Sequence, residues 1–249
     1  MTKTIVDVSK YQGTIDYAKL KSEGVTGVII RFGYGNALKF PSQFDPYAER
    51  NYSEAKKYGF EVGAYWYLYA ADETACEAEM QSFLHSLAGK QFELPVYTDW
   101  EEPKHAALGK AALSKLIAYC SEYLERERYF AGFYCNTNYY KNCINGSDLA
   151  KRYTFWQANY TSTQDSSLPK CDIRQYTSGG KLSGINGRVD MNRQFKDFYP
   201  IILENGLNNF GKVKRDFYTI ETGKMSDGDK ETVSKLLTNL SIDFTVKEV

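Results

Sequence analysis

The sequence has few of the residues on which metal sites and nucleophilic triads are built. Its only histidines are His85 and His105, no C-x-x-C pair occurs, and neither H-E-x-x-H nor G-x-S-x-G is present. Zinc chemistry, dithiol redox chemistry and hydrolysis by a serine or cysteine nucleophile are therefore not predicted, and we expect neither a metal nor a cofactor. The five cysteines indicate free thiols, although the spacing of Cys135 and Cys143 leaves one bridge open.

The chain also lacks net charge and long apolar runs. Its 249 residues include 31 Lys and Arg against 31 Asp and Glu, so we expect no nucleic-acid partner. No run of 18 apolar residues occurs, and the first residues contain no apolar signal segment. We therefore expect no membrane insertion, and synthesis in the cytoplasm without a signal peptide. Aromatic residues, in contrast, make up 15% of the chain, and Tyr-rich surfaces suit sugars or other proteins.

Strand-like and helix-like segments alternate through the first half of the chain. This alternation, followed by strands with little helix between them, predicts an α/β fold: a closed barrel whose second half lacks most outer helices. An open doubly wound sheet is the alternative, but no G-x-G-x-x-G follows the first strand. We expect strands at 4–9, 27–32, 62–69, 95–101, 130–135, 154–159, 172–176 and 188–191, and helices at 16–23, 46–58, 72–88 and 110–128.

The pattern changes after the last of these strands. We predict a catalytic barrel over residues 1–198, a polar linker over 199–212 and a small C-terminal βαβ unit over 213–249. The unit would contain strands at 216–221 and 242–246 and a helix whose apolar residues recur at helical spacing. About forty residues rarely bury a sufficient core alone. We therefore expect the unit to need a further partner, such as a second copy of the chain in a homo-oligomer. The helical apolar residues are Val233, Leu236, Leu237 and Leu240.

Four acidic residues stand out within or at the ends of predicted strands. Asp99 and Glu101 are two apart on one strand, so their side chains share a face. Asp7 and Asp190 lie inside β-branched segments of the first and last strands, which are neighbours in a closed barrel. Buried carboxylates need partners or a function. Four acids converging on one cleft are typical of a glycosidase site, although each alone is compatible with a structural role.

Five separated motifs occur over about residues 3–195. They are Asp7-Val-Ser-Lys-Tyr-Gln-Gly-Thr-Ile-Asp16, Gly63-Ala-Tyr-Trp-Tyr67, Tyr97-Thr-Asp-Trp-Glu101, Trp156-Gln-Ala-Asn-Tyr160 and the segment from Gln175 to Asn192. Together and in this order they resemble the glycoside hydrolase family 25 lysozymes. The resemblance implies a TIM-like (β/α)5(β)3 barrel, in agreement with the strand and helix count. It also implies a muramidase that hydrolyses the β-1,4 bond between N-acetylmuramic acid and N-acetylglucosamine of peptidoglycan, with retention, and it makes wall binding an alternative role for the C-terminal unit.

The same resemblance implies roles for individual residues. Glu101 matches the general acid/base, and Asp99 matches the acid that acts as nucleophile or assists the N-acetyl group of the substrate. Asp7 and Asp190 match the other two acids of the cleft. The residues expected to contact substrate are Tyr65, Trp66 and Tyr67, which stand where the family has aromatic or His residues near the sugar, and Arg31, Tyr34, Gln157, Asn159 and Gln175.

Taken together, these features predict a phage endolysin released by a holin, or a bacterial muramidase freed by lysis, whose partner is the glycan strand of peptidoglycan. Two alternatives stay open at this point. One is a barrel that binds peptidoglycan or a chitin-type glycan without cleaving it. The other is a glycosidase acting on chitin or another N-acetylated glycan.

Overall fold

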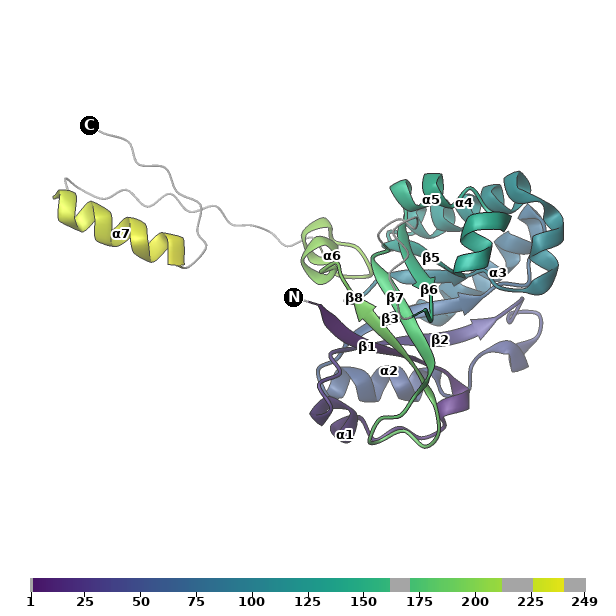
Figure 1. Cartoon of the computed structure of the whole chain (residues 1–249), viewed down its shortest axis with the longest axis horizontal. Helices are drawn as coiled ribbons and strands as arrows, with labels where there is room; N and C mark the ends of the chain where they lie inside the picture. Colours follow the sequence, from purple (N-terminus) through teal and green to yellow (C-terminus); the bar gives the residue numbers. More distant parts are fainter. Residues whose placement is uncertain (1, 162–170, 212–225, 240–249) are drawn as a thin grey trace. The chain divides into compact units, whose positions relative to one another are not determined.

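Eight strands close into one barrel in sequence order, from β1 to β8, with β8 hydrogen-bonded to β1. The computed structural model describes residues 2–161, 171–211 and 226–239 (Figure 1). All eight strands predicted for the barrel are present, and the predicted barrel is confirmed. The strands are β1 Lys3–Val8, β2 Gly27–Tyr34, β3 Glu61–Tyr67, β4 Val96–Asp99, β5 Ala131–Asn136, β6 Thr154–Ala158, β7 Ile173–Gly180 and β8 Val189–Gln194.

Helices follow each of the first five strands. The carboxylate of Asp72 begins α3 by accepting a hydrogen bond from the Ala75 N–H at 2.8 Å, as an N-cap residue does. The short α5 and α6 were not predicted. Within the described residues no helix is long and apolar enough to cross a membrane. The α-helices are α1 Tyr17–Ser22, α2 Ala48–Lys57, α3 Glu73–Leu87, α4 Lys110–Arg126, α5 Gly146–Arg152, α6 Tyr199–Asn205 and α7 Asp227–Asn239; shorter helical turns are η1 Lys10–Gln12, η2 Pro41–Gln43, η3 Pro103–Leu108 and η4 Tyr139–Cys143.

Strand direction decides which residues meet at the barrel rim. Strands β1 to β7 run parallel, whereas β8 is antiparallel to both β7 and β1. Figure 1 shows β7 and β8 as a long hairpin. The start of β8 therefore lies at the same rim as the C-terminal ends of the other strands.

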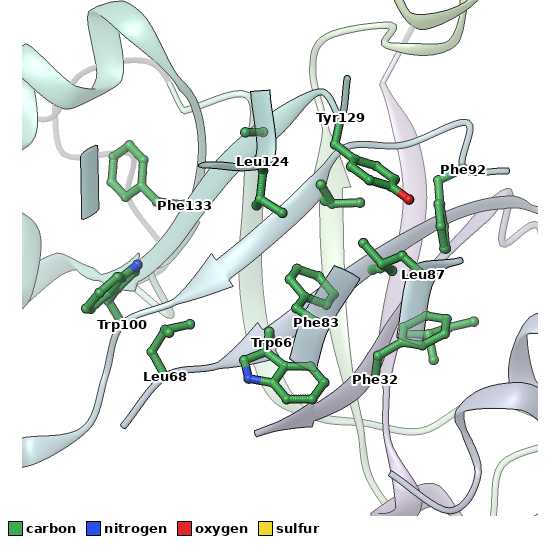
Figure 2. Packing of buried hydrophobic residues seen from close by; sticks show 14 of the residues in the cluster. Phe32, Trp66, Leu68, Phe83, Leu87, Phe92, Trp100, Leu124, Tyr129 and Phe133 are labelled. Atoms are coloured by element: carbon green, nitrogen blue, oxygen red, sulfur yellow. The ribbon is translucent and has the colours of Figure 1, made fainter. Parts of the chain in front are cut away.

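The buried apolar residues form two layers, one on each side of the barrel wall. The outer layer packs strand residues such as Trp66 and Phe133 against helical residues such as Phe83 and Leu124 (Figure 2). The inner layer fills the barrel with Ile5, Ile29, Tyr97, Trp156 and others. Successive side chains of a strand point to opposite faces, which explains why neighbouring residues belong to different layers.

The predicted linker is wrong for most of its length. Residues 199–205 form α6, and Phe198 and Ile202 are fully buried in the inner layer together with Ile5. The first compact unit accordingly spans Met1–Val213. This segment closes the end of the barrel where the parallel strands begin, because Phe198 and Ile202 pack with Ile5 of β1 and with Phe130, which directly precedes β5.

The second unit spans Lys214–Val249, and the part of it that the structure describes, residues 226–239, contains α7. The helix was predicted, and it begins at Asp227 after Ser226, whose hydroxyl accepts a hydrogen bond from the Asp229 N–H. The predicted strands at 216–221 and 242–246 lie outside the described residues. Of the apolar stripe, Leu236 is 56% exposed.

Asn208 ties the segment after α6 to the barrel. Its side-chain amide donates to the carbonyl oxygens of Phe92 and Leu94, both at 2.9 Å, and accepts from the Phe130 N–H at 2.7 Å. The side chain is fully buried. Without this side chain, the carbonyls of Phe92 and Leu94, which lead into β4, and the N–H of Phe130, which leads into β5, lose their partner. Leaving buried backbone groups without a hydrogen bond costs stability.

We therefore expect Asn208→Ala to lower the free energy of unfolding by about 2–4 kcal/mol, measured by urea denaturation. Asn209→Ala is the matched control, because Asn209 shares the left-handed backbone but is exposed. Equal losses in the two variants would contradict this role for the Asn208 side chain.

Candidate active site

One rim of the barrel gathers carboxylates from three strands. Asp99 ends β4 and Glu101 follows it, Asp7 lies near the end of β1, and Asp190 lies at the start of the antiparallel β8. Asp7 and Asp190 stand directly opposite each other in the β1/β8 register. The strand directions therefore bring all four predicted acids to one place, although they come from distant parts of the sequence.

These acids line a pocket of about 480 Å³. Tyrosines and short loop residues make up much of the rest of its wall. No group of three or more metal-ligating side chains arranged to hold an ion is found among the described residues. The pocket is lined by Asp7, Val8, Ser9, Lys10, Tyr11, Gln12, Arg31, Tyr34, Tyr65, Tyr67, Tyr69, Asp99, Glu101 and Asp190.

Asp99 and Glu101 differ in their surroundings. Asp99 is 4% exposed, and its Oδ1 has no hydrogen-bond partner. Burial raises the pKa of Asp99 well above its usual value, and the nearby Glu101 and Asp7 raise it further. Glu101 is half-buried, and its pKa is also raised, first by burial and then by repulsion from Asp190. Both shifts favour the protonated acid, which is the state that a general acid needs.

Asp7 and Asp190 form a close carboxyl pair, because they stand directly opposite each other on β1 and β8 and line the same pocket. Asp7 is buried, and burial followed by the charge of Asp190 raises its pKa well above the usual value. Burial also raises the pKa of Asp190. Two carboxyl groups in such contact hold a proton between them because two carboxylates would repel each other.

Arg31 supplies positive charge to the pocket wall. Its Nε and Nη2 both donate to Asp45 Oδ2, at 3.0 and 2.9 Å, and the Lys10 N–H donates to the same oxygen. The guanidinium lies 5.0 Å from the ring centre of Tyr11 and lowers the pKa of Asp99. Arg31 thus offsets part of the repulsion among the acids, while Asp45 fixes its orientation.

Three of the predicted aromatic contacts line the pocket and one does not. Tyr34, Tyr65 and Tyr67 do so. Trp66 is fully buried in the outer layer, 5.5 Å from Phe83, and donates its indole N–H to the Gly35 carbonyl (Figure 2). The prediction that Trp66 contacts substrate is therefore wrong, because its position in β3 turns it away from the barrel interior.

The predicted amide contacts are also corrected. Gln157 is 2% exposed and donates to Thr137 Oγ1, and Asn159 accepts from Thr161. Neither lines the pocket. Gln175 is equally buried but faces inward, where its Nε2 donates to Asp7 Oδ2 at 3.0 Å. Gln175 thus holds Asp7 by a hydrogen bond and does not line the pocket.

The sequence predictions missed residues just beyond the strand ends. Tyr11 is 76% exposed at the pocket, and Tyr69 lines it after β3. The ring centre of Tyr69 lies 5.8 Å from that of Tyr34 and 5.2 Å from that of Tyr67. Tyr11 lies inside the motif from Asp7 to Asp16, so its place directly after an acid-bearing strand was the signal that could have identified it.

The burial of Asp99 predicts a cost in stability. A carboxyl whose pKa is raised in the folded state weakens folding when it is ionised, and this penalty disappears as the pH falls below the unfolded value near 4. We expect Asp99→Asn to raise Tm at pH 8, by roughly 2–4 °C for each kcal/mol relieved, and the gain to shrink toward pH 4. Thermal unfolding at both pH values measures this.

The exposed Asp148 provides the matched control. Asp148→Asn should bring no gain in Tm that depends on pH in this way. A lower Tm for Asp99→Asn at pH 8 than for the unmodified protein would contradict the charge penalty.

The sequence of the chain is similar to that of several known proteins. The chain is 26% identical over 192 residues to the uncharacterized protein YegX of Escherichia coli O157:H7, covering 75% of this chain and 67% of that protein. It is 27% identical over 192 residues to an autolytic lysozyme of Clostridium acetobutylicum, covering 75% of this chain and 54% of that protein.

Solved structures share the fold. The modular autolysin LytC of Streptococcus pneumoniae, in complex with a synthetic peptidoglycan ligand, matches with a TM-score of 0.69 at 24% identity over 78% of this chain and 47% of that one. The CTP1L endolysin matches with a TM-score of 0.69 at 23% identity, over 96% of this chain and 80% of that one. The chain spans about half the length of LytC and of the autolytic lysozyme.

The family model described as glycosyl hydrolases family 25 matches residues 6–185, which include Asp7, Asp99 and Glu101. The match covers well over half of the chain, and the closed barrel agrees with it. The chain belongs to glycosyl hydrolases family 25.

Proposed function

We propose that this protein is a lysozyme that hydrolyses the β-1,4 bond between N-acetylmuramic acid and N-acetylglucosamine in bacterial peptidoglycan. The observation that carries the proposal is the pair Asp99 and Glu101 on one wall of the pocket, with Glu101 half-buried and its pKa raised. Family membership and the name of the autolytic lysozyme from Clostridium acetobutylicum support it. So does the peptidoglycan ligand of LytC.

In this proposal Glu101 donates its proton to the oxygen of the leaving sugar. Its burial and the neighbouring Asp190 favour the protonated form that this step requires. Asp99, two positions earlier, acts in its ionised form, which Arg31 favours against the burial that raises its pKa. Its carboxylate stabilises the positive charge that develops at the reacting carbon. It does so either as nucleophile or by assisting the N-acetyl group of the substrate.

We extend the proposal to a retaining course. Retention requires two carboxyl groups close together. Asp99 and Glu101 line the same pocket, and Glu101 is near enough to raise the pKa of Asp99. Glu101 would then return as the base that activates water. The exposed Tyr11, with Tyr34 and Tyr69, offers aromatic faces to the sugar rings on the β1 and β3 side of the pocket.

We further propose that the protein is a phage endolysin that acts on the wall once a holin or lysis releases it. The match to the CTP1L endolysin over 96% of this chain is in keeping with that role. A bacterial muramidase freed by lysis is the alternative, which the name of the clostridial autolytic lysozyme favours.

Mass spectrometry of the muropeptides released from purified cell walls tests the reaction. Reducing N-acetylmuramic acid ends are expected. Reducing N-acetylglucosamine ends would indicate another bond specificity, cleavage of chitin but not of walls would indicate another glycan, and binding without release would indicate a non-catalytic barrel.

In the same assay, Glu101→Gln should lower the rate of release by at least about 100-fold, because the amide keeps the shape but cannot donate the proton. The adjacent Glu102→Gln is the matched control. Its carboxyl accepts from the Tyr67 hydroxyl at 3.2 Å, and a Gln oxygen can accept that bond too. Normal release by folded Glu101→Gln would show that another group is the acid.

We also propose that residues 213–249 mediate self-association, through the apolar face of α7. Leu236 is 56% exposed and forms part of the apolar stripe with Val233 and Leu237. Light scattering of the full chain should give at least a dimer at micromolar concentration, and Leu236→Asp should shift it toward monomer. Lys235→Asp, beside the stripe, is the control. A monomer at all concentrations would instead favour wall binding.

A further inference from the structure

Behind the pocket, two buried amides converge on one oxygen of Asp7. The Asn192 Nδ2 donates to Asp7 Oδ2 at 2.8 Å, and the Gln175 Nε2 donates to the same oxygen at 3.0 Å. Asn192 is fully buried, and Gln175 is 2% exposed. Neither residue lines the pocket. Both residues therefore contact an acid of the site without lining the pocket that would hold substrate.

The orientation of Asn192 is imposed by a tryptophan. Its Oδ1 accepts a hydrogen bond from the Trp156 Nε1–H at 2.7 Å. An indole nitrogen can only donate. The amide of Asn192 therefore cannot turn over without placing its NH₂ group against the indole N–H, so its donor side stays on Asp7.

Two tyrosine hydroxyls orient Gln175 in the same sense. Tyr134 Oη and Tyr160 Oη lie 3.0 and 2.7 Å from Gln175 Oε1. With its oxygen receiving both hydroxyls, Gln175 presents its Nε2 to Asp7. A chain of rings on β5, β6 and the residues after β6 thus fixes two donors on a carboxyl group of β1.

These donors determine how Asp7 can hold a proton. An oxygen that receives two N–H groups is an acceptor, so a proton of the Asp7–Asp190 pair must lie on the other Asp7 oxygen or on Asp190. The donors also stabilise the ionised form of Asp7, against the burial that favours its neutral form. The result is a shared proton rather than one held by Asp7 alone.

We propose that Gln175 and Asn192 are positioning residues that make Asp7 share its proton with Asp190, and thereby limit the negative charge that Asp190 presents to Glu101. The inference rests on the proposed function only in giving Glu101 the role of acid. Without the donors, Asp7 keeps the proton and Asp190 becomes fully ionised. Its stronger repulsion then makes Glu101 harder to deprotonate.

The other ionisable groups around these acids are the same in all the variants that test this, except that Tyr160 is replaced in the second variant. Tyrosines from three parts of the chain face them, together with Asp99 at the end of β4 and Arg31 in the pocket wall. These groups are Tyr65, Tyr67, Tyr134, Tyr160, Asp99 and Arg31.

The test is a ¹³C NMR titration of the full-length protein labelled at Glu side-chain carboxyl carbons, with the Glu101 signal identified by its absence from Glu101→Gln. We expect Gln175→Met to move the titration midpoint of Glu101 upward by roughly 0.5–1 pH unit. Gln157→Met is the matched control, since Gln157 is equally buried on the adjacent strand and turned outward. It should leave the midpoint unchanged.

Tyr160→Phe provides a second variant that keeps the fold, because Tyr160 is 54% exposed. It removes one hydroxyl that orients Gln175 and should move the midpoint in the same direction by less. An unchanged Glu101 midpoint in Gln175→Met, or in Tyr160→Phe if Gln175→Met does not fold, overturns the inference. So does an equal shift in Gln157→Met.

The readout does not need catalysis, so it separates the two proposals. If Gln175→Met shifts the Glu101 midpoint but Glu101→Gln still cleaves walls normally, the positioning role stands and Glu101 is not the acid. If the midpoint is unchanged but Glu101→Gln no longer cleaves, Glu101 is the acid and the positioning role is wrong. The pH profile of wall cleavage by Gln175→Met should in addition show its alkaline limb displaced upward, which a purely structural defect would not produce.

Discussion

The structure depends on the cost of holding four carboxyl groups at one barrel rim. Asp99 is buried with one oxygen unpaired, and Asp7 is buried beside Asp190. Such groups repel one another and are poorly hydrated. The protein offsets this cost with Arg31, with amide donors and with shared protons, and a rigid framework is needed to hold all of them in place.

That framework is the filled interior of the barrel. Below the acids, Tyr97 and Trp156 pack edge to face with ring centres 5.3 Å apart, and Phe198 and Ile202 close the opposite end. Gly132 makes this packing fit, since a Cβ there would meet the Tyr97 ring at 2.5 Å. The apolar filling excludes water from beneath the acids, which explains why burial is the largest cause of their raised pKa values.

Strand periodicity predicted most of the fold and the meeting of the acids, since residues two apart share a face. Applied to β3, the same rule would have placed Trp66 outside the barrel, but the family resemblance overrode it. The segment around Asn208 was predicted to be a linker because its composition is polar. Composition does not distinguish an amide that faces water from one that pairs three backbone groups.

The antiparallel β8 has a consequence for the order of events during synthesis. Asn192 and Asp7 are 185 positions apart in the sequence, and the carboxyl pair exists only once the last strand has closed against the first. Contacts of such long range form late, because the intervening chain must first be ordered. A ribosome-bound chain that lacks β8 therefore has Asp99 and Glu101 but no Asp190 beside them, and the charge arrangement of the site is assembled only when the barrel is complete.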